Sequence, residues 1–429
     1  MMCTLCSVPP LLWLFILLIL FAAGDGGAAA LDTQAAYLAK MKEQFPGPGM
    51  SRWDFTSSPA PDYCRFRGVT CDEGGNVTGI DVTSWRLIGS LPPGICASLP
   101  KLRELRMAYN DVRGGLPLGV LNCTFLEVLN VSYSGVSGAV PNLSPLRALR
   151  MLDMSNNLFT GAFPEASIAN ITTLEVVNFN ENPGFHVWRP SQKSFMAMRR
   201  IRVLILSTVS IRGGIPAWFG NMTWLIDLEL SGNYLTGRIP ASLARLQKLQ
   251  FLELYYNELE GVVPAELGNL TELTEIDLSG NQLTGGIPES LCRLRNLLVL
   301  QMYSNWLTGP IPAVLGNSTQ LQILSVYDNE LTGEIPGDLG RHSDLNLMQV
   351  SENQLTGPLP PYACANGNLE YFLVRDNFLS GPIPAAYGEC TSLVRFQVSG
   401  NSLAGGLHPV AGLQRAPPVV GRVTTSGGP

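Results

Sequence analysis

Residues 225–240 read LIDLELSGNYLTGRIP, a frame of leucines, one asparagine and a Gly-x-Ile-Pro ending that recurs along the chain. The next copy reads LQFLELYYNELEGVVP at 249–264, and five more follow at the same distance, the last at 369–384. The asparagine of the frame stands at eight positions spaced by 24 residues: Asn233, Asn257, Asn281, Asn305, Asn329, Asn353, Asn377 and Asn401. A fixed period over this length predicts a repeat architecture.

Looser copies precede the regular ones and bring the count to fourteen units. Their residues in the asparagine slot are Trp85, Asn110, Ser134, Asn157, Asn182 and Val209. The stretch PGFHVWRPSQKSFMAMRR at 183–200 lacks the Gly-x-Ile-Pro ending and is the one irregular segment in the array.

Each unit predicts a short strand followed by a tight return path. Leu228 and Leu230 alternate with polar residues, so a strand here points its leucines inward. The amide of Asn233 can bond buried backbone groups at the turn and bridge to the next coil. Gly237 allows a tight bend and Pro240 fixes the return. One coil cannot bury its own apolar side, so the units are expected to stack into a solenoid with one continuous core.

This unit resembles the plant-type leucine-rich repeat, LxxLxLxxNxLTGxIPxxLGxLxx, over about residues 77–407. The Leu-Thr-Gly-x-Ile-Pro phrase is typical of the extracellular class. The resemblance implies an α/β repeat fold, a right-handed leucine-rich-repeat solenoid of about 14 repeats of 24 residues.

Residues 31–76 are expected to cap the first coil. LDTQAAYLAKMKEQF has apolar residues near helical spacing, with Asp32 or Thr33 as a possible N-cap. In an exported chain the nearby Cys64 and Cys71 are expected to close a short disulfide loop. The segment resembles the plant N-terminal repeat cap, W…CxWxGVxC, with Phe66 where that pattern has Trp.

The other cysteines of the repeats are interpreted as buried free thiols that act as small hydrophobic residues. They are Cys96, Cys123, Cys292, Cys364 and Cys390. Cys292 and Cys364 share a slot but stand three coils apart, about 14 Å at strand spacing, which is too far for a bridge.

The first 30 residues have the layout of a secretory signal peptide. LLWLFILLILF at 11–21 is about half the length of a membrane span and is followed by small residues. We therefore expect a secreted chain that passes through an oxidising compartment and carries surface glycans. The candidate acceptors, each the Asn of an Asn-x-Ser/Thr sequon, are Asn76, Asn122, Asn130, Asn142, Asn170, Asn221, Asn269 and Asn317.

Composition and motifs disfavour several function classes. The chain has 429 residues, is 14% charged and carries a net charge of −6, so no basic surface for nucleic acid is implied. Its three histidines stand in no metal-ligand spacing, and we find no HExxH, GxSxG, Walker or kinase phrase. We expect no enzymatic activity, no cofactor and no metal.

The outward slots of the strands predict one continuous binding surface on the inner face of the solenoid. Aromatic residues recur in it, acidic slots lie early and arginines lie late, which suits an extended peptide with a negative end at the late side. Tyrosine side chains give contact area and a polar group at low entropic cost. The candidate peptide-binding residues are Phe251, Tyr255, Tyr303, Tyr327, Tyr371, Arg375, Arg395 and Gln397.

The series FNENP (179–183), DLELSGN (227–233), LELYYN (252–257), LSVYDN (324–329), VSEN (350–353) and YFLV (371–374) sharpens the resemblance. It is similar to the ectodomain of receptors for C-terminally encoded peptides, which are class XI plant leucine-rich-repeat receptor kinases. The resemblance implies a small secreted peptide as ligand and a leucine-rich-repeat kinase as possible co-receptor. Receptors of this class read the peptide's carboxyl terminus with an Arg-x-Arg pair, which maps onto Arg395-Phe396-Gln397. This chain keeps the first arginine, so weaker capture is expected.

The end of the chain departs from the family pattern. After Leu407 comes HPVAGLQRAPPVVGRVTTSGGP, rich in Pro, Gly and Thr and interpreted as a disordered tail over 408–429. Full-length relatives continue through further repeats and a membrane helix to a Ser/Thr kinase, so we expect a truncated, soluble or decoy form in the apoplast. The alternative is a secreted inhibitor of a microbial wall-degrading enzyme. Such inhibitors have about ten repeats and a cysteine-paired C-terminal cap, which disfavours that alternative.

Overall fold

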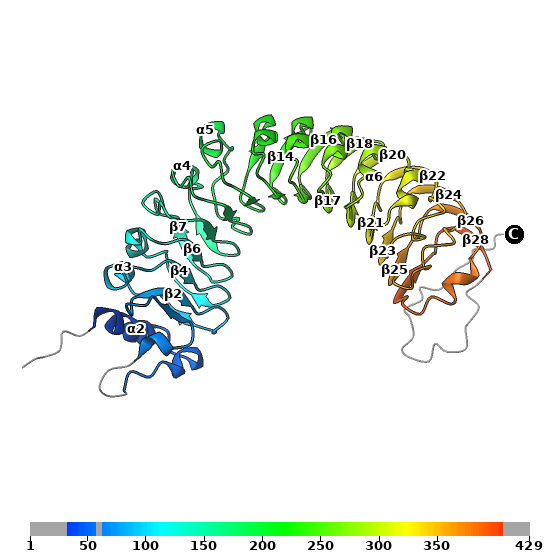
Figure 1. The fold of residues 1–429 in the computed structure, drawn as a ribbon. Helices are drawn as coiled ribbons and strands as arrows, with labels where there is room; N and C mark the ends of the chain where they lie inside the picture. The colour runs from blue at the N-terminus through cyan, green and yellow to red at the C-terminus, as the bar shows by residue number, and fades with distance from the viewer. Residues whose placement is uncertain (1–31, 57–61, 406–429) are drawn as a thin grey trace, which may run out of the picture.

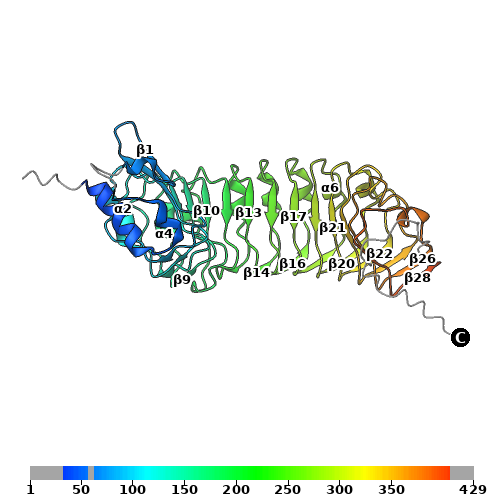
Figure 2. The ribbon, with the colours of Figure 1, turned by 90° about the horizontal axis from the view of Figure 1, so that it is seen from below.

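The computed structural model describes residues 32–56 and 62–405, which form a curved stack of coils (Figure 1). The N-terminal cap closes one end of the arch, and strands line its inner edge while short helices lie along its outer edge. Seen from below, the inner strands form a single row (Figure 2). The expected signal peptide (1–30) and tail (408–429) lie outside the described residues.

The inner, concave sheet has fifteen strands in chain order, parallel except for the first pair. Strand β1 belongs to the cap, and each of the other fourteen opens one coil, which confirms the predicted repeat count. The strands are β1 (Val69–Cys71), β2 (Val77–Asp81), β4 (Glu104–Arg106), β6 (Val128–Asn130), β8 (Met151–Asp153), β10 (Val176–Asn178), β11 (Val203–Ile205), β13 (Asp227–Glu229), β15 (Phe251–Glu253), β17 (Glu275–Asp277), β19 (Val299–Gln301), β21 (Ile323–Ser325), β23 (Leu347–Gln349), β25 (Tyr371–Leu373) and β27 (Arg395–Gln397).

A second parallel sheet of nine strands runs along one side of the later coils. Its strands are β12 (Arg212–Gly213), β14 (Tyr234–Gly237), β16 (Glu258–Val262), β18 (Gln282–Gly285), β20 (Trp306–Pro310), β22 (Glu330–Glu334), β24 (Gln354–Gly357), β26 (Phe378–Pro382) and β28 (Ser402–Ala404). In the early coils two smaller pairs take its place, β3 (Ile88–Gly89) with β5 (Asp111–Val112) and β7 (Ser137–Ala139) with β9 (Leu158–Thr160).

Short helices form the outer, convex side of the coils. The α-helices beyond the cap are α3 (Ile95–Ser98), α4 (Glu165–Ala169), α5 (Gln192–Phe195) and α6 (Glu289–Cys292). The 3₁₀ turns of the coils are η3 (Leu118–Asn122), η4 (Ala217–Asn221), η5 (Ala241–Arg245), η6 (Ala265–Asn269), η7 (Ala313–Asn317) and η8 (Ala385–Tyr387). In most later coils the repeat's proline immediately precedes the turn, as Pro240 precedes η5, because its fixed φ suits a helix start.

The leucines of the repeat fill one core that runs the length of the stack. Leu228 in β13, Leu230 just beyond it and Leu235 in β14 are all essentially inaccessible to solvent. Equivalent residues of the neighbouring coils pack above and below them, so every coil depends on its neighbours for burial.

The asparagines of the repeat form a buried ladder that ties the coils together. The Asn281 amide nitrogen donates to the carbonyls of Leu278 and Ser279 in its own coil and of Leu254 in the preceding coil, at 3.0–3.2 Å. Its oxygen accepts from the Leu259 amide, also in the preceding coil, at 3.0 Å. The sequence predicted a bridge to the next coil, but the bridge runs to the preceding one. Asn281 follows its own strand, and at this position its side chain lies beside the turn of the preceding coil.

The irregular stretch at 183–200 is accommodated by aromatic packing. Residue Val176 pairs with Val203, 27 positions away, so this coil is longer than the 24-residue unit. The Trp188 indole stacks on Phe163 with ring centres 4.0 Å apart, and its nitrogen donates to the Val209 carbonyl at 2.8 Å. Val209 stands in the asparagine slot and has no side-chain amide, and Trp188 instead bonds the backbone carbonyl of Val209.

The cap is built around the predicted helix. Helix α2 (Thr33–Gln44) begins after Asp32, whose carboxylate accepts from the Gln34 amide at 3.0 Å, and two 3₁₀ turns follow at Pro48–Arg52 and Tyr63–Arg65. Phe66 packs on the fully buried Trp53, with ring centres 5.8 Å apart, so an aromatic side chain at this position completes the core of the cap.

Three disulfides are present in the described residues, where one was predicted. Cys64–Cys71 is confirmed, with Cα atoms 5.6 Å apart. The interpretation of Cys96, Cys123, Cys364 and Cys390 as free thiols is wrong, because Cys96 bonds Cys123 and Cys364 bonds Cys390. The partners stand 27 and 26 residues apart, in different slots of adjacent coils, whereas the sequence comparison considered only cysteines in the same slot. Cys292 is free and buried, as predicted, and burial raises the pKa of its thiol to about 12.

The asparagine ladder makes a direct prediction. Asn281→Ala removes four hydrogen bonds and leaves buried carbonyls unpaired, so we expect a loss of about 2–3 kcal/mol of local stability. Hydrogen exchange at the Leu259 amide measures it and should accelerate strongly. Gln282→Ala, at the exposed neighbouring position, is the matched control, and equal exchange in both variants would contradict the assignment.

The two inter-coil disulfides can be mapped chemically. Their Cα separations of 5.1 and 6.0 Å lie within the bridging range. Digestion without reduction is expected to yield one peptide pair joining Cys96 to Cys123 and another joining Cys364 to Cys390. Alkylation of any of these four cysteines in unreduced, denatured protein would contradict the pairing.

Candidate functional site

The concave sheet arranges outward-facing side chains in rows across neighbouring strands. Asp227, Phe251 and Glu275 stand in register in one row, and Glu229, Glu253 and Asp277 stand in the next. Strand spacing in a sheet is about 4.8 Å, so residues in a row are close neighbours.

All eight candidate peptide-binding residues lie on or beside this sheet. Phe251, Tyr371, Arg395 and Gln397 belong to strands β15, β25 and β27. Tyr255, Tyr303, Tyr327 and Arg375 each stand two residues beyond the end of their strand. From β15 to β27 there are six strand spacings, about 29 Å, or about nine residues of an extended peptide. The structure therefore brings neighbouring members into contact but spreads the whole set along a groove.

A tyrosine cluster occupies the middle of the face and consists of Tyr255, Tyr256, Tyr303 and Tyr327. The Tyr303 and Tyr327 rings stack with centres 4.6 Å apart, and Tyr255 meets Tyr256 edge to face at 5.6 Å. Burial first, and the Tyr256 hydroxyl next, raise the pKa of Tyr303. The pKa values of Tyr255 and Tyr327 are also raised, chiefly by burial, so the phenols of Tyr255, Tyr303 and Tyr327 stay protonated near neutral pH and can donate hydrogen bonds to a peptide backbone.

Tyr256 was missed by the sequence reasoning, which placed only alternate strand residues on this face. Its backbone adopts the left-handed conformation at the turn before Asn257, with φ of 50°. The ring lies over Gly280 of the next coil, where any side chain would collide with it. A glycine 24 residues after this tyrosine was the sequence feature that could have predicted its position on the face.

An acidic row overlaps the early part of the tyrosine cluster, since Tyr255 and Tyr256 follow β15. It comprises five carboxylates on three adjacent strands: Asp227, Glu229, Glu253, Glu275 and Asp277. Asp277 accepts from the Ser279 amide at 2.9 Å and from the Gln301 side chain at 3.2 Å. Within residues 32–56 and 62–405, no Lys or Arg forms an ion pair with any of the five. The sequence predicted acidic residues in the early outward slots, but only the strand register shows that the five carboxylates lie close together.

Burial raises the pKa of every member of the acidic row. For Glu253 burial is the largest cause, followed by the charges of Glu229 and Glu275, and its pKa rises from 4.5 to about 8. For Asp227 the same causes, burial first, raise the pKa from 3.8 to about 6. The pKa values of Glu229, Glu275 and Asp277 are also raised, chiefly by burial.

The late end of the face carries the two predicted arginines. Arg375 is engaged by carboxylates, pairing with Glu352 and lying 3.4 Å from Asp376. Arg395 is exposed and stands in register with Tyr371. With the Gln397 amide turned so that its oxygen faces the guanidinium, that oxygen accepts from Arg395 Nη2 at 2.9 Å and Nε at 3.2 Å. Gln397 therefore orients Arg395, which leaves Arg395 as the cation better placed to meet an incoming carboxylate.

The predicted glycan acceptors fall into two groups. Five share one slot, where the convex helix ends and the chain returns to the concave strand, and all five are exposed: Asn122, Asn170, Asn221, Asn269 and Asn317. Of the other three, Asn142 is exposed and Asn130 is half-buried. Asn76 is half-buried, and its amide nitrogen already donates to both oxygens of Asp72.

Two features are absent from the described part of the chain. No helix there is long and apolar enough to cross a bilayer. No group of three or more His, Cys, Asp or Glu side chains in those ranges is placed to hold a metal ion.

Comparison with known proteins agrees with this architecture. The leucine-rich-repeat N-terminal domain model matches residues 31–72, and the leucine-rich-repeat model matches 224–246, 248–270, 272–294 and 320–342. The chain is a leucine-rich-repeat protein. It is 44% identical over 191 residues to the receptor protein-tyrosine kinase CEPR1 of Arabidopsis thaliana, covering 44% of this chain and 20% of that protein. It is 39% identical over 189 residues to Receptor-like protein kinase 7 of the same plant, covering 43% and 19%.

Solved structures of plant receptor ectodomains have the same fold. The receptor kinase HAESA of Arabidopsis, in complex with the peptide hormone IDA and the co-receptor SERK1, superposes with a TM-score of 0.76 at 31% identity. That match covers 87% of this chain and 66% of that one. The plant peptide hormone receptor RGFR1 in complex with RGF2 has a TM-score of 0.67 at 30% identity, covering 79% and 53%. The chain spans about one fifth of the length of the curated relatives it matches, and the matched regions are their leucine-rich-repeat ectodomains.

The acidic row predicts that stability falls as pH rises. Because its folded pKa values are raised, the folded chain binds more protons than the unfolded chain between about pH 4.5 and 8, and the row loses stabilising protonation across that window. The melting temperature is expected to fall from pH 5 to pH 8, and Glu253→Gln should reduce that fall. Glu260→Gln, at an exposed position of β16, is the control. A pH dependence that Glu253→Gln leaves unchanged would contradict the assignment.

Proposed function

We propose that the concave face between β13 and β27 binds an extended peptide hormone outside the cell, as part of a plant receptor-like system. The observation that carries this proposal is the continuous surface that leads from the acidic row, across the tyrosine cluster, to the exposed Arg395. The ectodomains of HAESA and RGFR1, both solved in complex with a peptide hormone, share the fold at about 30% identity, which supports the proposal.

The charge distribution defines the orientation of the peptide. The five acidic side chains on β13, β15 and β17, none of which pairs with a Lys or Arg in the described part of the chain, favour a basic residue or the amino-terminal half of the ligand. Arg395 on β27 favours its terminal carboxylate, since a guanidinium forms charge-assisted hydrogen bonds with it. The tyrosine cluster between them supplies apolar contact and phenolic donors for the backbone of the middle residues.

A co-receptor leucine-rich-repeat kinase is the partner that the receptor likeness suggests, because HAESA is solved with SERK1. In this proposal the peptide forms part of the surface that the partner contacts. Secretion to the apoplast and a decoy role for a soluble form remain predictions from the sequence. The decoy role requires that the chain bind peptide without any further domain.

Calorimetric titration with a synthetic hydroxyproline-containing peptide of the C-terminally encoded class tests the proposal. The peptide is compared as its free acid and its C-terminal amide. The acid is expected to bind more tightly by about 1–2 kcal/mol, the value of one charge-assisted hydrogen bond. Arg395→Gln should abolish that difference, and Arg245→Gln on the convex turn η5 should preserve it.

Gln397→Arg provides the complementary gain. It recreates the Arg-x-Arg pair of the related receptors and should strengthen binding of the acid by about 1–2 kcal/mol while leaving the amide unchanged. Equal affinity for acid and amide in the unaltered protein would remove carboxylate recognition from the proposal. Absence of binding by both forms would remove this peptide class.

A further inference from the structure

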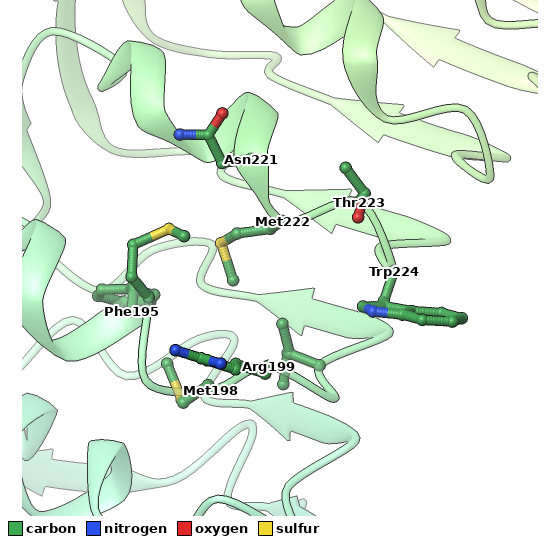
Figure 3. Close-up of a pocket in the computed structure, with 9 residues that line it drawn as sticks. Phe195, Met198, Arg199, Asn221, Met222, Thr223 and Trp224 are labelled. Carbon is green, nitrogen blue, oxygen red and sulfur yellow. The ribbon is translucent and has the colours of Figure 1, made fainter.

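A partly apolar pocket of about 320 Å³ lies away from the concave strands, between the irregular coil and the turn that ends η4 (Figure 3). Buried side chains of Phe195, Met198, Ile201 and Met222 form its floor. Its volume lies at the lower end of the range of small-ligand sites, about 300–1,000 Å³.

The rim of the pocket holds a complete glycosylation sequon. Asn221-Met222-Thr223 lines it directly, with Trp224 immediately after. In Figure 3 Asn221 and Arg199 lie on opposite sides of the pocket, with Met222 between them and the indole of Trp224 at one end. Asn221 is the point on this rim at which a covalent substituent can be attached.

The Asn221 side chain is available for attachment. Its oxygen accepts from Arg245 Nη1 at 3.3 Å, and its nitrogen, the atom that would carry a sugar, makes no hydrogen bond within the described ranges. By contrast, the amide nitrogens of Asn76 and Asn170 are engaged in hydrogen bonds.

Trp224 gives the pocket an aromatic wall. Its side chain is 55% exposed, high for the largest aromatic residue. The Lys248 ammonium lies 3.8 Å from the ring centre but does not line the pocket. Lys248 therefore covers ring surface outside the pocket, and the indole surface that lines the pocket stays open to a ligand.

Two further cavities adjoin sequons in the same slot of other coils. One of about 510 Å³ is lined by Asn317, Ser318 and Thr319, and one of about 680 Å³ by Asn170 and Thr172. Neither has an aromatic residue in its lining, which is dominated by Arg, Ser, Thr and Asn. The pocket beside Asn221 differs from them in combining an attachment point with an indole and three methionines, Met196, Met198 and Met222.

We propose that Asn221 carries an N-linked glycan whose first N-acetylglucosamine lies in this pocket, with one pyranose face against Trp224 and the acetamide methyl among the methionines. A pyranose ring presents C–H groups that pack on an aromatic surface, and flexible methionines adapt to an irregular ligand. The sugar shields apolar surface that the protein otherwise exposes. This inference rests on the proposed extracellular placement, but not on peptide binding.

Attachment of the glycan requires a sugar donor that the secretory pathway supplies, a lipid diphosphate-linked oligosaccharide. A bond forms between Asn221 Nδ2 and C1 of the sugar, the bond from C1 to the diphosphate oxygen breaks, and the diphosphate leaves with the electron pair. The nitrogen gives up one proton. No oxidation or reduction is involved.

The test compares three forms of the secreted protein: fully glycosylated, trimmed by an endoglycosidase to one N-acetylglucosamine, and unglycosylated at this site through Thr223→Ala. Glycopeptide mass spectrometry is expected to find Asn221 occupied. Peroxide oxidation of Met196, the partly exposed methionine of the lining, should be slow in the first two forms and several-fold faster in the third, since methionine oxidation follows exposure. Thr223→Ser, which keeps the sequon, should behave as the unaltered protein.

Two further variants separate pocket filling from a general effect of glycans. Asn269→Gln removes a sugar from the same slot two coils away, where Glu272 stands in place of Trp224, and should leave the oxidation of Met196 unchanged. Trp224→Glu keeps the glycan but removes the wall, so oxidation should become fast, and this comparison stands even where Thr223→Ala does not fold.

An unoccupied Asn221, or equal oxidation rates in the intact, trimmed and unglycosylated forms, would overturn the inference. Peptide affinity, measured in parallel, should be the same in Thr223→Ala and the unaltered protein because Asn221 lies at the convex turn. A failed peptide titration therefore leaves the glycan result standing, and the reverse also holds.

Discussion

The buried asparagine ladder is the constraint on which the rest of the molecule depends. A coil with a three-residue strand leaves carbonyls at its turn that no strand partner reaches, and these groups are costly to bury unpaired. Asn281 and its equivalents satisfy them and at the same time accept from an amide of the preceding coil. Each coil is thereby held at a fixed offset from the previous one, so an insertion must be absorbed outside the ladder, as Trp188 and Phe163 do.

The fixed offset produces the candidate site. Because strands pair residue for residue, side chains 24 positions apart become neighbours. The outward residues that differ between repeats therefore form rows across the concave sheet. Asp227 and Glu275 flank Phe251 in one row, and burial of both carboxyls raises their pKa values. A surface that holds like charges together is locally unfavourable, a feature that functional sites commonly tolerate and that a cationic partner would relieve.

The sequence predicted the fold well because a 24-residue period carries redundant information. Fourteen coils and the burial of the leucines follow from that period, whereas the cap helix and the Cys64–Cys71 bridge follow from the helical spacing and the cysteine pair of residues 31–76. The Cys96–Cys123 and Cys364–Cys390 bridges were missed because they join different positions of the repeat in adjacent coils. Equivalent positions of the repeat do not reveal which non-equivalent positions lie close together. The contribution of Tyr256 was missed because its left-handed backbone breaks the alternation of a strand. The engagement of Arg395 by Gln397 and of Arg375 by Glu352 depends on side-chain placement that no spacing encodes.

The central claim is that a peptide lies along the concave face with its carboxyl terminus at β27. Photo-crosslinking tests it most directly, using two versions of the same peptide with a photoreactive group at either end. The account predicts that the carboxyl-terminal probe labels peptides containing Tyr371 or Arg395, and that the amino-terminal probe labels those containing Phe251 or Glu275. The reverse pattern, or labelling confined to the convex turns η4 to η7, would contradict it.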